Sequence, residues 1–183
     1  MMYHLSNFLE PKEQLVEPKT KYRLDFKYAL YKILIDNFKG FCELYSDFKY
    51  ANDIENCLGW RKTKLFCECI FELARQNIGC YKLFPRMMSF YLSKSLTDIN
   101  EFKQYSNRSG TIFEVDISIE NCQKYDMELF TDAEIYLSNQ NELNEEVFNK
   151  CYEYATYYWN GETSDKPIYE YLYYGKINIK PII

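Results

Sequence analysis

In a segment near the C-terminus, tyrosines alternate with other side chains at every second position, a pattern that suits an extended strand and no other regular structure. Successive side chains of a strand point to opposite faces. In residues 167–174, one face therefore carries Tyr169, Tyr171 and Tyr173, and the other carries Ile168, Glu170 and Leu172. Glu170 lies between two aliphatic side chains, so its carboxylate must be paired, hydrogen-bonded to a ligand, or at the edge of a pocket.

Other short segments have the period-two or apolar pattern of strands between turn signals. These are residues 2–5, 88–93, 111–118, 125–130 and 177–179. In the third of them Phe113, Val115 and Ile117 share one face. The sequence therefore predicts at least one sheet, assembled from segments distributed along the chain.

Helical spacing of apolar residues dominates the rest of the chain. We expect helices over 22–44 with an interruption at Gly40, over 65–79 ended by Gly79, and over 145–159. Two shorter helices are predicted, one capped by Ser95 or Thr97 and one by Thr131 or Asp132. Residues 11–18 and 46–56 are predicted to be irregular, with Asp53 as a cap. One α+β domain over residues 1–183, with a twisted, partly antiparallel sheet, follows from this order.

Composition and charge restrict the possible functions. The 183-residue chain has a net charge of −5, which argues against a broad nucleic-acid-binding surface but not against a local basic site. No apolar run approaches the ~20 residues of a membrane span, and no basic-then-apolar leader is present. With seven cysteines and no leader, we expect reduced thiols and a cytoplasmic location. The cysteine spacing and the single histidine argue against a zinc site.

The single histidine, His4, limits catalytic chemistry. Phosphate loops, nucleophile elbows and HExxH motifs are absent, which leaves His4, Tyr91 and Glu170 on predicted strands and Arg86 just before one. Such a histidine can bind a ribose hydroxyl, a tyrosine can stack on a flat ring, and an arginine can meet a phosphate. A glutamate can stabilise positive charge on a ribose as a leaving group departs. Each residue also has a plain structural explanation, such as a frayed terminus for His4 or an edge-strand charge for Glu170.

Together and in this order, these residues resemble the His-Tyr-Glu group of the ADP-ribosyltransferase superfamily. The resemblance lies in Tyr3-His4, in 89–93 (SFYLS) and in 169–172 (YEYL). It implies a split sheet that clasps NAD as substrate. The helical segment 22–79 departs from the family pattern and is interpreted as an insert. Glu170 is then the catalytic residue, and His4, Tyr91, Arg86 and Ser89 bind NAD. The acceptor is an unknown protein or nucleic acid, and no metal or membrane is involved.

Ile168 stands two positions before Glu170, where relatives that modify arginine carry Glu or Gln. This argues for an acceptor other than arginine. A competing hypothesis is a catalytically silent interaction module, such as a phage or mobile-element inhibitor, that binds a protein through exposed aromatic side chains. The candidates for that aromatic face are Tyr154, Tyr157, Tyr158, Tyr171, Tyr173 and Tyr174. A nuclease or RNA-binding protein is a third hypothesis, weakened by the acidic charge.

Overall fold

The strands form two antiparallel sheets in a computed structural model that describes residues 1–6, 9–18, 24–49, 62–79, 82–105 and 109–182. Sheet A has the order β1-β4-β7-β2. Its strands are β1 (Met2–Ser6), β4 (Thr111–Val115), β7 (Ile177–Pro181) and β2 (Gln14–Val16). Sheet B has the order β3-β6-β5, from β3 (Phe90–Leu92), β6 (Tyr169–Tyr173) and β5 (Gln123–Asp126).

The two sheets meet where β1 runs beside β3. Tyr3 and Ser93 form an isolated antiparallel bridge there, with N–H···O distances of 2.9 and 2.8 Å in the two directions. Strands β6 and β7 are consecutive in sequence but lie in different sheets, so the chain crosses between the sheets at Gly175. The result is a split arrangement in which β1, β3 and β6 lie next to one another at the junction.

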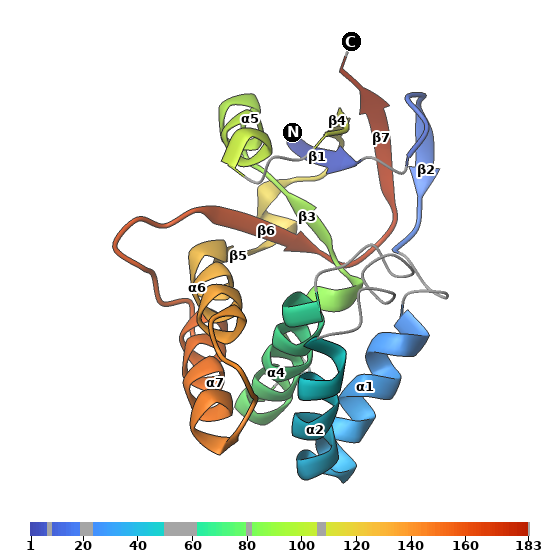
Figure 1. Cartoon of the computed structure of the whole chain (residues 1–183). Helices are drawn as coiled ribbons and strands as arrows, with labels where there is room; N and C mark the ends of the chain where they lie inside the picture. Colours follow the sequence, from blue (N-terminus) through green and yellow to red (C-terminus); the bar gives the residue numbers. More distant parts are fainter. Residues whose placement is uncertain (7–8, 19–23, 50–61, 80–81, 106–108, 183) are drawn as a thin grey trace.

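Five helices gather on one side of sheet B, at the bottom of Figure 1. They are α1 (Leu24–Asp36), α2 (Phe38–Lys49), α4 (Lys62–Ile78), α6 (Met127–Ser138) and α7 (Glu145–Trp159). Helix α5 (Leu96–Tyr105) lies away from them, beside β1. Two short 3₁₀ helices, η2 (Arg86–Met88) and η3 (Ile119–Asn121), precede β3 and β5.

Sheet B is covered on both faces by apolar side chains. Leu172 belongs to the core beneath the helices, together with Phe71, Phe130 and Tyr158. Its neighbour Tyr171 belongs instead to a second core between the sheets, which includes Met2, Phe90, Leu92, Phe113, Val115, Ile177 and Ile179. Because side chains alternate along β6, Glu170 lies on the same face as Leu172 and points toward the helices.

The α+β class is confirmed, and so are several predicted elements. Helix α7 covers the predicted 145–159, and β1, β6 and β7 lie where strands were expected. Ser95 caps α5 by accepting a hydrogen bond from Asp98 N at 3.1 Å. Strand β3 is shorter than the predicted 88–93 because the chain from Arg86 to Met88 is a 3₁₀ helix. Strand β4 likewise ends at Val115, short of the predicted 118.

The predicted interruption at Gly40 is wrong, because the first helical segment breaks at Asn37. Asn37 Oδ1 accepts from Gly40 N at 3.0 Å, so Asn37 acts as the N-cap of α2. A Cβ at position 40 would lie 2.3 Å from Asn37 Nδ2, so glycine leaves room for that cap. Residues 46–49 continue α2 rather than forming a loop, and Asp53 lies outside the described residues.

Two other expectations are corrected. Residues 125–130 are not one strand: β5 ends at Asp126 and α6 begins at Met127. Asp126 is the N-cap of that helix, so neither Thr131 nor Asp132 caps it. The stretch 11–18, expected to be irregular, contains β2, which is ordered by pairing with β7.

Candidate functional site

Glu170 is buried where β6 faces the helical layer. Only 5% of the residue is exposed, although it carries a carboxylate. In the register of sheet B it pairs with Tyr125, and its neighbour Leu172 pairs with Tyr91. The alternation of β6 therefore directs Glu170, Leu172 and Tyr91 toward the same face of the sheet. This places a titratable group beside apolar side chains, so partners are required.

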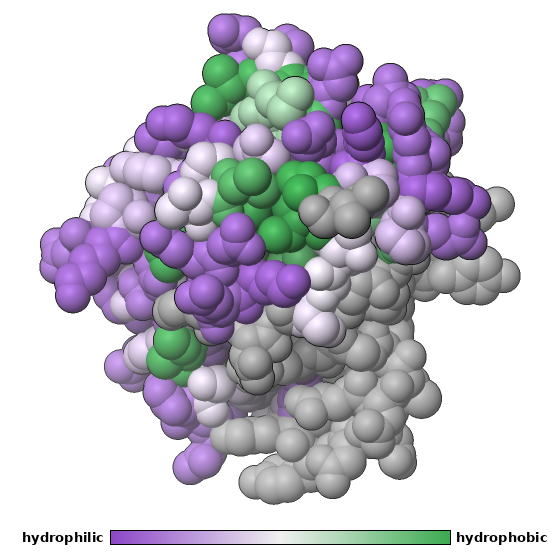
Figure 2. Space-filling model, turned by 90° about the horizontal axis from the view of Figure 1, so that it is seen from above, coloured by the Kyte–Doolittle hydropathy of each residue, from purple (hydrophilic) through white to green (hydrophobic). Residues whose placement is uncertain are grey.

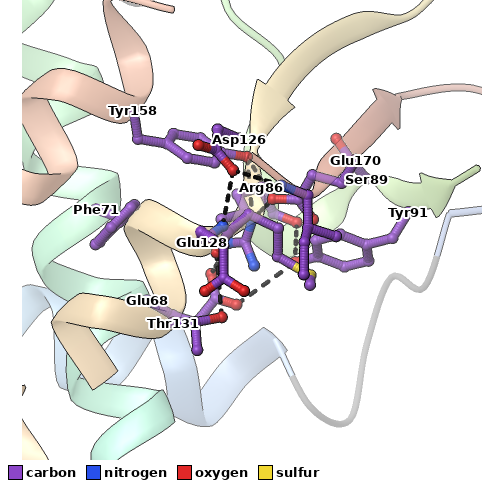
Figure 3. A network of polar contacts seen from close by, with 12 residues as sticks. Glu68, Phe71, Arg86, Ser89, Tyr91, Asp126, Glu128, Thr131, Tyr158 and Glu170 are labelled. Carbon is purple, nitrogen blue, oxygen red and sulfur yellow. Dashed lines mark hydrogen bonds and ion pairs between the residues drawn. The ribbon is translucent and has the colours of Figure 1, made fainter. Parts of the chain in front are cut away.

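The partner of Glu170 is Arg86 from the 3₁₀ turn before β3. Arg86 Nη1 donates to Glu170 Oε1 and, at 3.0 Å, to the Tyr158 hydroxyl. Arg86 Nε lies 3.4 Å from Oε2 of Glu68, a residue of α4. The guanidinium also stacks over the ring of Phe130, with Cζ 4.0 Å from the ring centroid. Figure 3 shows these side chains converging from α4, α6, α7 and sheet B.

Two tyrosines complete this group of residues, which we call the Arg86 cluster: Glu68, Arg86, Tyr91, Tyr158 and Glu170. The Tyr158 hydroxyl donates to Glu170 Oε1 at 2.7 Å while it accepts from Arg86. The Tyr91 hydroxyl donates to the Arg86 carbonyl oxygen at 2.8 Å and lies 3.5 Å from Glu68 Oε1. The tyrosines therefore hold both the backbone and the side chain of Arg86.

The Arg86 cluster contains two carboxylates and one guanidinium. Burial lowers the pKa of Arg86, but Tyr158, Tyr91 and Glu68 raise it by more, so the guanidinium stays charged. Burial raises the pKa of Tyr158 well above its usual value, against the opposing effect of Arg86, so its hydroxyl keeps the proton that it donates. Glu170 Oε2 is buried and has no hydrogen-bond partner among the residues that the structure describes.

His4 reaches the same region from sheet A. Its Nδ1 lies 3.0 Å from the Tyr91 carbonyl oxygen, which can only accept, so Nδ1 carries the proton of this hydrogen bond. The imidazole packs edge-on against Phe90 at a centroid distance of 5.7 Å. His4 therefore contacts the backbone of β3, whereas the side chains of Tyr91 and Glu170 lie on the helical side of sheet B.

Ser89 completes the set of residues assigned from the sequence. Its hydroxyl donates to the Pro85 carbonyl oxygen at 2.8 Å and stabilises the turn that carries Arg86. The structure thus brings Arg86, Tyr91 and Glu170 together. Ser89 stabilises the turn that carries Arg86, and His4 contacts the backbone of β3. The Arg86 guanidinium, assigned from the sequence to a phosphate, contacts two carboxylates and a phenol.

Sequence reasoning missed Glu68 and Tyr158. Glu68 lies within the run 65–73, LFCECIFEL, whose other charge is Glu72. A carboxylate in a buried apolar run is the same signal that drew attention to Glu170. Tyr158 lies on the predicted helix 145–159 but could not be distinguished from its neighbouring tyrosines. It is fully buried.

Asp126 fixes the start of β6, close to Glu170. It is 1% exposed, and its Oδ1 accepts from Glu128 N and Ile168 N, each at 3.0 Å. Its Oδ2 accepts from Ser164 N at 2.7 Å. One buried carboxylate therefore both caps α6 and anchors the chain that enters β6, two residues before Glu170.

Comparison with known protein families gives one result. Residues 6–183 match the model of a family described as a protein of unknown function, DUF2441. The chain belongs to the DUF2441 family. No curated protein matches the chain. What a DUF2441 protein of this kind does must therefore be argued from its site.

Three further features of this DUF2441 chain concern its helices, its metal-ligating side chains and its cysteines. Among the described helices, none combines the length and apolarity needed to cross a bilayer. The described residues contain no group of three or more His, Cys, Asp or Glu side chains suited to a metal ion. Cys42, Cys67, Cys69, Cys122 and Cys151 are free thiols, and Cys57 and Cys80 lie outside the described residues.

The aromatic face considered from the sequence does not exist as one surface. Tyr158 is fully buried and Tyr171 is buried between the sheets, whereas Tyr174 is 44% exposed. Figure 2 views the molecule from above, at the end that carries the N-terminus and α5. Apolar side chains gather near the middle of that face within a largely hydrophilic surround. An exposed apolar surface is therefore present, but the buried tyrosines do not make it.

Proposed function

We propose that this DUF2441 protein is a NAD-dependent ADP-ribosyltransferase-like enzyme in which Glu170 is the catalytic carboxylate. One observation carries the proposal: the Arg86 cluster holds two carboxyl groups against one guanidinium, and no described residue gives Glu170 Oε2 a hydrogen-bond partner. A fixed negative charge in a dry environment stabilises a developing cation far better than the same charge in water.

The reaction that uses such a charge is cleavage of the nicotinamide–ribose bond of NAD. The bond between ribose C1′ and the nicotinamide nitrogen breaks, and nicotinamide leaves as a neutral molecule with the bonding electron pair. The ribose is left with oxocarbenium character, which Glu170 stabilises. A nucleophilic atom of a protein or nucleic-acid acceptor then bonds to C1′ and loses its proton to the medium.

The placement of the strands also supports this proposal. His4, Tyr91 and Glu170 lie on β1, β3 and β6, which are neighbours at the junction of the two sheets. A split sheet is what the resemblance to ADP-ribosyltransferases implies. In this proposal Tyr91 stacks on nicotinamide, Arg86 and Ser89 hold the turn beside it, and His4 positions Tyr91 through its hydrogen bond to the Tyr91 carbonyl oxygen.

A second function is favoured by a different observation. Glu170 Oε1 and Arg86 Nη1 are hydrogen-bonded to each other and to the Tyr158 hydroxyl, as expected for a structural ion pair. The exposed apolar surface of Figure 2 suits a catalytically silent module that binds another protein. This candidate predicts stable folding without any consumption of NAD.

The proposal is tested by incubating purified protein with NAD and measuring nicotinamide by chromatography, alone and with a cell lysate. We expect release above the uncatalysed rate, increased by lysate, with label from adenine-labelled NAD transferred to macromolecules. Glu101→Gln, an exposed position on α5, serves as a matched control with unchanged release. Release no faster than the uncatalysed rate under both conditions would refute the enzyme and leave the interaction module.

A further inference from the structure

We propose that Glu68 is a positioning residue that acts as an alternative counter-ion for Arg86, and so leaves Glu170 free to serve a ligand. Glu68 is a residue of α4, and its side chain is fully buried. It contacts Arg86 through Nε, and its Oε1 lies 3.5 Å from the Tyr91 hydroxyl. Glu68 and Glu170 share the Arg86 guanidinium, and Glu68 acts on Glu170 by competing for it.

The distribution of contacts around Arg86 is unequal. Glu170 Oε1 receives hydrogen bonds from both Arg86 Nη1 and Tyr158, whereas Glu68 Oε2 faces Nε at 3.4 Å without a hydrogen bond. A planar guanidinium offers several donors at fixed angles, so it can serve two carboxylates from different edges. In the structure Glu170 has the stronger contact, and Glu68 is held close enough to replace it.

The electrostatic consequence decides the role of Glu68. If Arg86 and Glu170 were alone, they would form a neutral pair, and withdrawing Glu170 would leave a buried, uncompensated cation. Such a state is strongly unfavourable in a protein interior. With Glu68 present, Arg86 keeps a counter-ion when the Glu170 carboxylate turns away, so the exchange of partners is possible.

The kinetic part of this inference rests on the proposed function, and the counter-ion part does not. If Glu170 stabilises a ribosyl cation, Glu68→Gln should lower kcat by about tenfold or more while leaving KM for NAD near the wild-type value. Glu68→Asp keeps the charge one methylene farther from Arg86 and should recover part of that loss. A merely structural role predicts a parallel loss of folded protein and no such division between kcat and KM.

The counter-ion part is tested by melting temperatures, which need no enzyme activity. Glu68→Gln and Glu170→Gln each leave Arg86 with one carboxylate, so each should lower the melting temperature only slightly, by about 3 °C or less. The double variant leaves Arg86 with none. We expect it to melt roughly 10 °C below the sum of the single effects.

Two controls make the result decisive. Adding Arg86→Met to the double variant removes the unpaired cation. The triple variant should recover at least half of the extra loss in melting temperature, and it should fold even where the double variant does not. Glu101→Gln, on exposed α5, should show additive effects with either substitution. Additive losses in Glu68→Gln/Glu170→Gln would overturn the inference whether or not NAD is consumed. An active wild type with an unchanged kcat in Glu68→Gln would overturn its kinetic part alone.

Discussion

Replacing Arg86 with methionine should destabilise the protein more than any exposed substitution can. The methionine keeps an apolar stem over Phe130 but removes the only cation paired with Glu68 and Glu170 among the described residues. Their side chains are 0% and 6% exposed, so neither carboxylate can recover its hydration without opening the core. Removing one partner of a buried ion pair typically costs about 3–5 kcal/mol.

That cost is a large fraction of the ~5–15 kcal/mol by which a domain is usually stable. For a chain of this size it corresponds to a fall in melting temperature of roughly 6–20 °C. The assay is urea unfolding at pH 7, followed by circular dichroism. The dependence of the free energy of unfolding on urea concentration should be the same in both proteins, so that a change in the midpoint reports a change in stability. Lys94→Met, on an exposed residue after β3, is the control and should change stability by less than about 0.5 kcal/mol. An Arg86→Met protein within about 1 kcal/mol of wild type would refute the view that Arg86 is the buried counter-ion of Glu68 and Glu170.

Three further predictions concern other buried polar groups. Asp126→Ala should cost about 2–4 kcal/mol in urea unfolding, because three backbone N–H groups lose their acceptor, and a loss under 1 kcal/mol would contradict this. Tyr158→Phe should cost about 1–3 kcal/mol by the same measurement, since its hydroxyl links Arg86 to Glu170; wild-type stability would contradict it. Burial raises the pKa of Tyr45 to about 12, above the value of about 10 in an unfolded chain, so the unfolded state releases this proton first. The free energy of unfolding should therefore fall from pH 10 to 12, by about 1.4 kcal/mol per pH unit for this group. The fall should be less steep in Tyr45→Phe. Equal pH dependence in the two proteins would rule out Tyr45 as a cause.

Parts of this fold follow from local pattern alone. Helix α7 could be located from its apolar stripe, and the structure adds that Asn144 caps it by accepting a hydrogen bond from Val147 N. The alternation of β6 likewise predicted the strand and a Glu170 carboxylate that needs a partner, and the structure pairs it with Arg86. In these segments the tertiary contacts reinforce what the sequence already favours.

Other parts depend on contacts that a single sequence does not reveal. Strand β2 exists through its pairing with β7, and no local alternation indicates it. The break between α1 and α2 is set by the side chain of Asn37, which competes with the more obvious Gly40. Asp126 was overlooked as a cap because two of its three hydrogen bonds come from residues that follow α7.

The candidate site was predicted in the same partial way. Glu170, Arg86 and Tyr91 could be selected from strand positions and chemistry, and the structure places them together. Glu68 comes from α4, which is distant in sequence from β6, and Tyr158 comes from α7, which directly precedes β6. Their contribution depends on how those helices pack against sheet B, and composition or periodicity does not determine that packing.

The central claim is that the carboxylate of Glu170 stabilises positive charge on ribose, and one comparison tests it directly. Nicotinamide release from NAD in a single turnover should be measured for wild type and for Glu170→Gln, with NAD affinity determined by calorimetry on the same samples. The amide keeps the shape of the side chain but removes its charge. The account predicts a fall in the rate of about 100-fold or more with NAD affinity within about threefold of wild type. An unchanged rate of release in Glu170→Gln would contradict it.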